Sequence, residues 1–231
     1  MSVFLMLWTG SPAARADMKI FLDPAFGGTH KGLSYGTLSE SQLLLDLASS
    51  IQDQWDRSKK APIVLTRVGD YDLDVADRRK LINAEDEAIW VHLALSTRKS
   101  DPKPWVKIHV LEGKDEAPIS ALTRLDHAHD PFYDTSLALA SEMALVLPSN
   151  GKSGQVSIDQ KAPMASLYGI SAPAVALEIF FTPAEYDPDF NASQEIKELS
   201  EKIALGLDLF VQKGIFRSHD KKRRKRASSD S

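Results

Sequence analysis

Two carboxylates are the side chains of this sequence whose type and position best suit chemistry. Glu40 stands at the start of a segment with helical periodicity, and Glu178 interrupts the apolar run 174–180. An unpaired carboxylate buried among hydrocarbon side chains is costly. Glu178 must therefore line a wet cleft, pair with a base, or face outward near the end of the run. In a cleft it would be suited to moving a proton to or from a reacting group.

The histidines add several possible metal ligands. The densest group is 126–130 (DHAHD), where His127 and His129 are the candidates, although a His-x-His in a polar loop is more often simply solvated. His30 lies in a glycine-rich loop and could turn toward a neighbouring site, and His92 lies in an apolar run. Because the chain has no cysteine, a metal can be held only by His, Asp or Glu. The same absence excludes a disulfide scaffold, an iron–sulfur centre and a cysteine nucleophile.

Three arginines, a glycine pair and one tryptophan have both structural and functional interpretations. Arg67, Arg78 and Arg79 lie near expected strand and helix ends, where we favour ion pairing within the fold over contact with a substrate. The amides of Gly27-Gly28 can bind an anion, but no phosphate-loop lysine pattern accompanies them. Trp105 could stack on a sugar or pack in the core.

Strands and helices alternate along the chain and must position these groups. Apolar runs predict strands over 18–23, 62–66, 88–95, 105–111 and 174–180. Apolar residues at helical spacing predict helices over 40–57, 75–86, 136–147 and 193–211. The run 88–95 is apolar almost throughout, which is typical of a central strand buried on both faces. This order predicts an α/β fold with a single twisted, mostly parallel sheet flanked by helices on both faces.

Composition and charge narrow the classes of protein. The 231 residues are 43% hydrophobic and 26% charged, which is typical of a globular chain and excludes a wholly disordered, collagenous or multi-span membrane protein. The net charge of −4 is unevenly distributed, because residues 217–231 hold seven Lys or Arg and two Asp, a net +5 that leaves −9 for the rest. We expect residues 215–231 to be a disordered basic tail. Its segment Arg217–Arg226 can contact an anionic surface through Coulomb attraction, without specific nucleic-acid recognition.

The first residues predict export. Residues 3–8 form a short apolar run, and Ala14-Arg15-Ala16 matches the small-x-small pattern of a signal-peptide cleavage site. The run is too short to span a bilayer, and the usual basic residues before it are missing. We expect residues 1–16 to be a truncated signal peptide and the mature chain to be periplasmic or otherwise exported, with no transmembrane span. The alternative is a start that packs as a stray apolar strand.

Five segments in consistent order resemble the zinc-dependent N-acetylmuramoyl-L-alanine amidases. Residues 19–28 (KIFLDPAFGG) resemble the family's K-I-x-L-D-P-G-H-G-G, and Glu40 with the helix that it opens resembles the family's glutamate and its helix. The other three segments are 65–84 (T-R-x-x-D and R-x-x-x-A-N), 88–96 (the strand that carries S-I-H-A-N) and 173–181 (P-A-V-L-V-E-x-G-F). The likeness places an amidase-like domain at 17–214.

The resemblance implies a hydrolase of the bacterial cell wall. Such enzymes cut the amide between the lactyl group of muramic acid and L-alanine in peptidoglycan, with zinc held by two histidines and a glutamate. Zinc lowers the pKa of bound water from about 15.7 to about 7, and a second glutamate then moves the proton. By this resemblance Glu40 is a metal-ligand position and Glu178 is the general acid/base position.

The chain departs from the family at both histidines. Phe26 stands at the first position and Leu93 at the second, so that Glu40 alone remains of the three ligands. Catalytic zinc requires three protein ligands and a water, and apolar bulk would fill the place of the ion. His92 is the neighbour of Leu93, but adjacent residues of a strand face opposite sides. We therefore expect His92 to point away from the old metal position.

Three functions are compatible with these observations. We favour a catalytically inactive, amidase-like envelope protein that has no cofactor and binds peptidoglycan, a muropeptide or an envelope protein. The second is an active zinc amidase that has rebuilt its site from Glu40 with His30, His92, or the pair His127 and His129. The third is an anchoring protein that acts through its basic tail. Zinc content and peptidoglycan hydrolysis separate the first two.

Overall fold

A computed structural model describes residues 18–35, 37–56, 61–97, 106–113, 127–147, 156–160, 164–181 and 191–214. The expected signal peptide at 1–16, the expected basic tail at 215–231 and Trp105 lie outside these residues. None of the helices within them is both long enough and apolar enough to cross a membrane.

A six-stranded sheet forms the centre of the described chain, with the strand order β4-β1-β5-β8-β6-β7. Strands β4 (Ile63–Leu65), β1 (Lys19–Pro24), β5 (Ala88–Thr97) and β8 (Ala174–Phe181) run parallel to one another. Strand β6 (Val106–His109) runs antiparallel to β8, and β7 (Val156–Asp159) runs parallel to β6 at the edge. The parallel part brings the ends of β1, β5 and β8 to one edge of the sheet, where the candidate residues lie.

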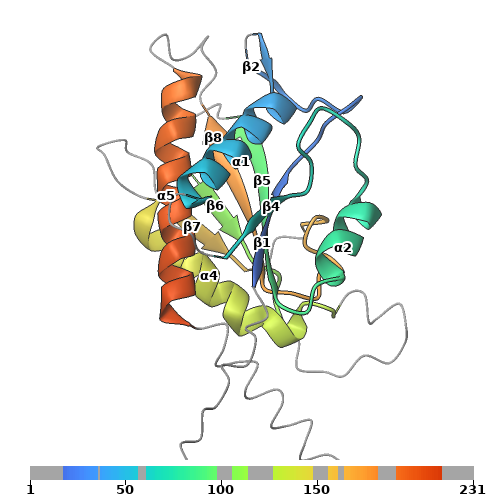
Figure 1. Cartoon of the computed structure of the whole chain (residues 1–231), viewed down its shortest axis with the longest axis vertical. Helices are drawn as coiled ribbons and strands as arrows, with labels where there is room; N and C mark the ends of the chain where they lie inside the picture. The colour runs from blue at the N-terminus through green and yellow to red at the C-terminus, as the bar shows by residue number, and fades with distance from the viewer. Residues whose placement is uncertain are drawn as a thin grey trace, which may run out of the picture.

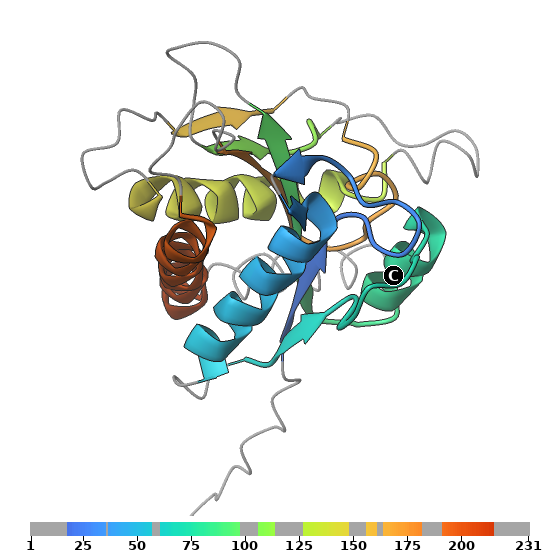
Figure 2. The ribbon, with the colours of Figure 1, turned by 90° about the horizontal axis from the view of Figure 1, so that it is seen from above.

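Helices cover both faces of the sheet, as predicted (Figures 1 and 2). On one face lie α1 (Glu40–Asp56), α4 (Tyr133–Val146) and α5 (Ala192–Lys213), and on the other lies the short α2 (Val75–Asn83). A single 3-10 turn, η1 (Asp130–Phe132), precedes α4. The helices and sheet together give the expected mostly parallel α/β architecture.

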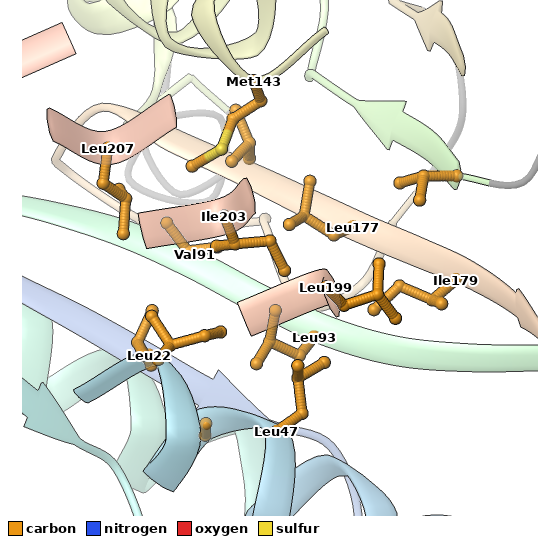
Figure 3. Packing of buried hydrophobic residues seen from close by; sticks show 14 of the residues in the cluster. Leu22, Leu47, Val91, Leu93, Met143, Leu177, Ile179, Leu199, Ile203 and Leu207 are labelled. Carbon is orange, nitrogen blue, oxygen red and sulfur yellow. The ribbon is translucent and has the colours of Figure 1, made fainter. Parts of the chain in front are cut away.

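The main core fills the space between the sheet and the three longer helices. Because side chains alternate across a strand, every second residue of β1, β5 and β8 points into it. Leu22, Val91, Leu93 and Leu177 supply the sheet side, and they meet side chains of α1, α4 and α5 such as Leu199 (Figure 3). The burial of these side chains accounts for the longest predicted strands and helices.

A smaller core fills the α2 face. Phe21 and Trp90 stack with ring centroids 6.5 Å apart, and Ile82 of α2 and Leu167 pack with them. Near the carboxyl ends of the strands, this face carries polar residues such as Asp23 and His92 in place of apolar ones.

Three short elements were not predicted. Strand β7 has only two apolar residues, and the hairpin of β2 (Ser34–Tyr35) and β3 (Leu38–Ser39) has strands of two residues each. Such runs are too short for a periodicity to be recognised. Helix α2 also ends earlier than predicted, at Asn83.

Candidate functional site

The Glu40 side chain accepts hydrogen bonds from backbone N–H groups at the edge of the sheet. Pairing between β1 and β5 ends at Pro24 and Leu93, so the next free N–H of β5 needs another acceptor. Glu40 supplies it, since its Oε1 accepts from the Leu95 N–H and its Oε2 from the Leu33 N–H, both at 2.9 Å. The first residue of α1 therefore joins the helix to β5 and to the loop before the β2–β3 hairpin.

Burial dominates the electrostatics of this carboxylate. The Glu40 side chain is almost inaccessible, and its desolvation raises the pKa, against the opposing effect of the two backbone hydrogen bonds and of nearby His92. Burial and the negative charge of Glu40 in turn raise the pKa of Tyr35. The ionised Glu40 carboxylate is therefore poorly solvated. Among the described residues its hydrogen bonds come from backbone N–H groups and not from a cation.

Glu178 pairs with a base, one of the three arrangements considered from the sequence. Its Oε2 lies 2.9 Å from Nε2 of His109, a residue of the antiparallel strand β6. His109 is buried, and its Nδ1 lies 4.0 Å from Asp159 of β7. The side chain of Glu178 remains 27% exposed. Sequence reasoning missed His109, although its place on the polar side of an alternating strand was a usable indication.

The orientation expected for β5 is wrong. Leu93 is fully buried in the main core, beside Leu47 and Leu199, on the face opposite the candidate site (Figure 3). His92 instead lies on the α2 face, where it lines a cleft. Strand alternation explains the reversal, because Leu93 points into the main core and its neighbour His92 therefore points to the α2 face. Leu93 therefore does not fill the space beside the glutamates.

Ala94 is the β5 residue connected to both glutamates through the backbone. It pairs with Glu178 in the register of β5 and β8, and it directly precedes Leu95, whose N–H binds Glu40. We call Glu40, Ala94 and Glu178 the glutamate edge. The side chain of Ala94 is a methyl group packed against the main core, so this position of β5 offers no ligand atom to the edge.

Phe26 follows β1 by two residues and approaches Glu40 with an unusual backbone conformation. Its φ of +62° is the one positive value among the described residues other than glycine, a conformation that costs about 1–2 kcal/mol for an L-residue. A Cβ on Gly32 would lie 2.5 Å from Oε2 of Glu40 and 2.9 Å from Cδ2 of Phe26. The ring and the carboxylate therefore pack against the same glycine, and the expected approach of Phe26 to Glu40 is present.

Two arginines hold the strained segment in place. Arg67 is buried and donates only to carbonyl oxygens, among them those of Pro24, Ala25 and Ser41 at 3.2, 3.0 and 2.7 Å. Arg78 donates to the carbonyl oxygen of Phe26 at 3.2 Å. Both side chains are thus engaged by the fold itself.

Asp23 is the centre of a second polar network, near the end of β1 and beside His92 of β5. It accepts from Thr66 Oγ1 at 2.6 Å, lies 2.6 Å from Nδ1 of His92, and forms a close ion pair with Arg78. Burial pushes the pKa of Asp23 upward, but the His92 hydrogen bond and the positive charges of His92 and Arg78 outweigh it, so that the pKa lies below the ordinary value. The network fixes the orientation of the His92 ring.

The glycine loop has no free amides for an anion. Gly27 N–H donates to the His30 carbonyl at 2.8 Å, and Gly28 N–H donates to Asp70 at 2.9 Å. His30 is exposed and lies 3.2 Å from Asp72. The anion-binding interpretation of this loop is therefore wrong.

The remaining histidine candidates lie elsewhere. His129 is near Ala174, the first residue of β8, four residues before Glu178 on the strand. His127 is bound to Asp130, and His129 is bound to the carbonyl of Glu112 at 2.9 Å. Neither side chain joins the glutamate edge.

A cleft of about 580 Å³ opens beside the glutamate edge, on the α2 face. It is lined by the end of β1 and Phe26, by the segment 72–75 and α2, by Trp90 and His92 of β5, and by 164–166. We call it the α2 cleft. Neither Glu40 nor Glu178 lines it.

The described residues do not fit a catalytic zinc ion. Three protein ligands are required, and no group of three or more His, Asp or Glu in this part of the chain could hold a metal. Glu40 already binds two backbone N–H groups, and Phe26 and Ala94 supply carbon where nitrogen would be needed. Asp23 holds Nδ1 of His92, which leaves Nε2 as one further donor whose charge is felt by Glu40, so that the donor set is still short of three.

The fold is that of known cell-wall amidases. Solved structures that resemble it include the N-acetylmuramoyl-L-alanine amidase AmiC2 of Nostoc punctiforme, with a TM-score of 0.61, 17% identity and coverage of 85% of this chain and 98% of that one. An N-acetylmuramoyl-L-alanine amidase from Clostridium difficile 630 gives a TM-score of 0.59 at 19% identity, with coverage of 85% and 98%. The CwlD amidase from Clostridioides difficile, in complex with the GerS lipoprotein, gives 0.57 at 15% identity, with coverage of 84% and 98%.

Family membership follows from the sequence itself. No curated protein matches the chain. The family model described as N-acetylmuramoyl-L-alanine amidase, however, matches residues 20–208, which is most of the chain. The matched range runs from β1 into α5 and includes the glutamate edge. The chain therefore belongs to the N-acetylmuramoyl-L-alanine amidase family.

Proposed function

We propose that this protein is an exported, amidase-like protein of the cell envelope that binds peptidoglycan fragments without hydrolysing them. The observation that carries the proposal is the state of the glutamate edge. Both oxygens of Glu40 accept backbone N–H groups, and Glu178 is paired with His109. The side chains of Phe26, which packs against the same Gly32 as Glu40, and of Ala94, which pairs in register with Glu178, have no atom that could bind a metal. The fold is kept while the donor set for a metal is incomplete.

The chemistry of amide cleavage explains why this matters. Water at neutral pH is a poor nucleophile, and the family's activity depends on a metal that generates hydroxide. An ion held by one carboxylate lacks the ligands that fix its position. A glutamate at the general-base position then has no activated water to deprotonate.

Binding to peptidoglycan is supported by the family and by the open surface beside the edge. Members are defined by action on the muramoyl–L-alanine bond, and the α2 cleft is of a size that takes small ligands. An envelope protein is the alternative partner. The CwlD amidase, a structural relative, is found with a lipoprotein, so a protein ligand on this fold has a precedent.

Peptidoglycan sedimentation and dye release test the proposal together. We expect the purified chain to sediment with insoluble peptidoglycan and to release no dye from labelled peptidoglycan, with or without added zinc. A Glu178→Ala variant should bind as well as the wild type, because Glu178 does not line the α2 cleft. Dye release by the wild type that is lost in Glu178→Ala would show an active amidase and overturn the proposal. Failure to sediment would overturn its binding half.

A further inference from the structure

The three helices on the main-core side of the sheet are acidic, and the sequence that follows the last of them is basic. Helices α1, α4 and α5 contain ten Asp or Glu, three Lys and no Arg. Residues 217–231 hold a net charge of +5. We propose that the segment Arg217–Arg226 folds back onto a groove between α1 and α5 of its own chain. The inference concerns a surface away from the glutamate edge and does not depend on peptidoglycan binding.

The groove is formed by one face of α5 and the end of α1. The two helices lie side by side (Figure 1), and Ser50 Oγ of α1 donates to Ser200 Oγ of α5 at 2.8 Å. Further along both helices, a hollow of about 200 Å³ opens between them. It is lined by Gln54 and Trp55 of α1 and by Glu201, Ala204, Leu205 and Asp208 of α5. We call it the α5 groove.

The α5 groove combines apolar side chains with carboxylates. Trp55 is buried, whereas Leu205 is 49% exposed. The α5 residues at 201, 204, 205 and 208 have the i, i+3, i+4, i+7 spacing of one helix face, so Glu201 and Asp208 lie on the same side as Leu205. No lysine or arginine is among the described residues that line the groove. The occupant that this surface fits has long aliphatic side chains that end in a positive charge, as Lys and Arg do.

The basic segment begins close enough to reach this surface. Helix α5 ends at Lys213, and Gly214 caps it in the left-handed conformation with a φ of +62°, which turns the chain off the helix axis. At a rise of 1.5 Å per residue, Asp208 and Glu201 lie about 9 and about 20 Å back along the helix from Gly214. The ten residues Arg217–Arg226 span up to about 33 Å when extended, so they can cover both carboxylates. Because they belong to the same chain, their effective concentration at the groove is high.

A second basic segment follows α1 and competes for the same carboxylates. Arg57, Lys59 and Lys60 stand between α1 and β4, outside the described residues. Their three charges do not balance the acidic excess of the three helices. Lys213, the last lysine of α5, is already paired with Glu142 of α4 at 2.6 Å. The tail, with seven Lys or Arg, is the larger source of positive charge beside the groove, and the charge balance favours it.

Carbodiimide cross-linking of the full chain tests the contact, because it joins a lysine amine to a carboxylate that lies against it. In low salt we expect mass spectrometry to find the tail lysines joined to Glu201 or Asp208, and we expect these links to decrease as added salt screens the charges. The tail lysines are Lys221, Lys222 and Lys225.

A tail variant tests the role of charge without changing any described residue. It replaces the four tail arginines by glutamine and keeps the three lysines available for cross-linking: Arg217→Gln, Arg223→Gln, Arg224→Gln and Arg226→Gln. We expect its links to Glu201 and Asp208 to fall about 3- to 10-fold, the loss expected when several exposed ion pairs are removed together. Unchanged links in this variant, or links that do not respond to salt, would overturn the inference.

Limited trypsin digestion gives a second readout, because a docked segment is cut more slowly than a free one. Glu201→Gln/Asp208→Asn should speed cleavage of the tail by about the same 3- to 10-fold in low salt. Asp86→Asn/Glu87→Gln is the matched control, since it removes two carboxylates just before β5 that do not line the groove, and it should leave the rate unchanged.

Two further outcomes would contradict the assignment of the occupant. Glu201 and Asp208 joined only to Lys59 or Lys60 would show that the segment after α1 occupies the groove. In a mixture of ¹⁴N- and ¹⁵N-labelled chains, tail links that join one chain to another would show a contact between copies. Tail links within single chains, lost in the arginine variant, uphold the inference whether or not the protein sediments with peptidoglycan.

Discussion

Two neighbouring regions of this molecule treat polar groups in opposite ways. At the glutamate edge each carboxylate is engaged by the protein, Glu40 by two backbone N–H groups and Glu178 by His109. In the α2 cleft, a few residues away along β5, Arg79 and the buried Trp90 Nε1 have no protein partner that could satisfy them. A site that binds a ligand needs uncommitted donors, and among the described residues these lie mostly at the α2 cleft, although Nδ1 of His109 beside Glu178 is also without a hydrogen-bond partner.

The comparison shows that a glutamate at a metal-ligand position can also be required by the fold. Glu40 supplies the acceptor that β5 needs where β1 ends, so removing it would damage the sheet edge whether or not a reaction occurs there. A glutamate at a catalytic position is therefore weak evidence for catalysis in this family when the structure also depends on it. What distinguishes the two regions is whether their polar atoms are already bonded.

The largest expected effect comes from restoring nitrogen donors to the glutamate edge. The double variant Phe26→His/Ala94→His places imidazoles on both sides of Glu40, and we expect it to bind about one zinc per chain. Phe26→His/Leu93→His should bind none, because Leu93 points into the core between β5 and α1. Atomic absorption after dialysis measures both, beside the wild type. Equal zinc uptake by the two double variants would contradict the assignment of Ala94 to the edge.

The next largest effect is a loss of stability when the carboxylate of Asp23 is removed. Asp23→Ala leaves Arg78 buried without its counter-ion and His92 without its partner. Loss of one member of a buried pair typically costs about 3–5 kcal/mol, and we expect the free energy of unfolding to fall by about that amount in urea denaturation. Asp77→Ala, which breaks the exposed pair with Lys80, is the control and should change it by less than about 1 kcal/mol.

The pH dependence of stability also tests the role of Asp23, and its sign follows from the direction of the pKa shift of each carboxylate. The folded-state pKa of Asp23 lies below the ordinary 3.8, so its ionised form stabilises the fold above that pH, and this contribution is lost as the pH falls through the folded-state pKa. Glu40 has a pKa raised above 4.5, so its contribution is present in acid and is lost as the pH rises through the folded-state value. Unfolding curves from pH 2 to 7 should lose their acid slope in Asp23→Ala. An unchanged slope would assign the acid sensitivity to another carboxylate.

A smaller loss is expected when the structural role of Glu40 is removed. Glu40→Ala leaves the N–H groups of Leu33 and Leu95 without acceptors. Unsatisfied buried donors cost about 1–3 kcal/mol each, and relief of the desolvated charge offsets part of this, so we expect a net loss of about 2 kcal/mol. Hydrogen exchange should show faster exchange at the Leu95 amide than in the exposed control Glu201→Ala. Full stability in Glu40→Ala would show that its bonds contribute nothing.

The sequence predicted the architecture better than the site, for physical reasons. Long apolar runs such as β5 and β8 need both faces buried, and that requirement is visible in one sequence. The side on which His92 points is not visible in the same way, since a shift of one residue in the register exchanges the two faces of a strand. Ala94 has no reactive atom to attract notice. Arg79 could be distinguished from Arg67 and Arg78 only when the partners of all three arginines were known.

Phe26→Gly gives the smallest expected change in stability and the cleanest separation of fold from binding. Glycine adopts a φ of +62° without strain, which returns about 1–2 kcal/mol, while the extra freedom of glycine in the unfolded chain removes about 0.4–1 kcal/mol. The ring is 41% exposed, so little apolar burial is lost. The free energy of unfolding should therefore stay within about 1 kcal/mol of the wild type, whereas binding of N-acetylmuramoyl-L-alanyl-D-isoglutamine should weaken. Phe26→Ala, which keeps the backbone strain, should be the less stable of the two variants and should bind equally poorly. A Phe26→Gly protein that binds like the wild type would mean that the strained ring serves only to pack beside Glu40, and the distinction between the two regions would then rest on Arg79 and Trp90.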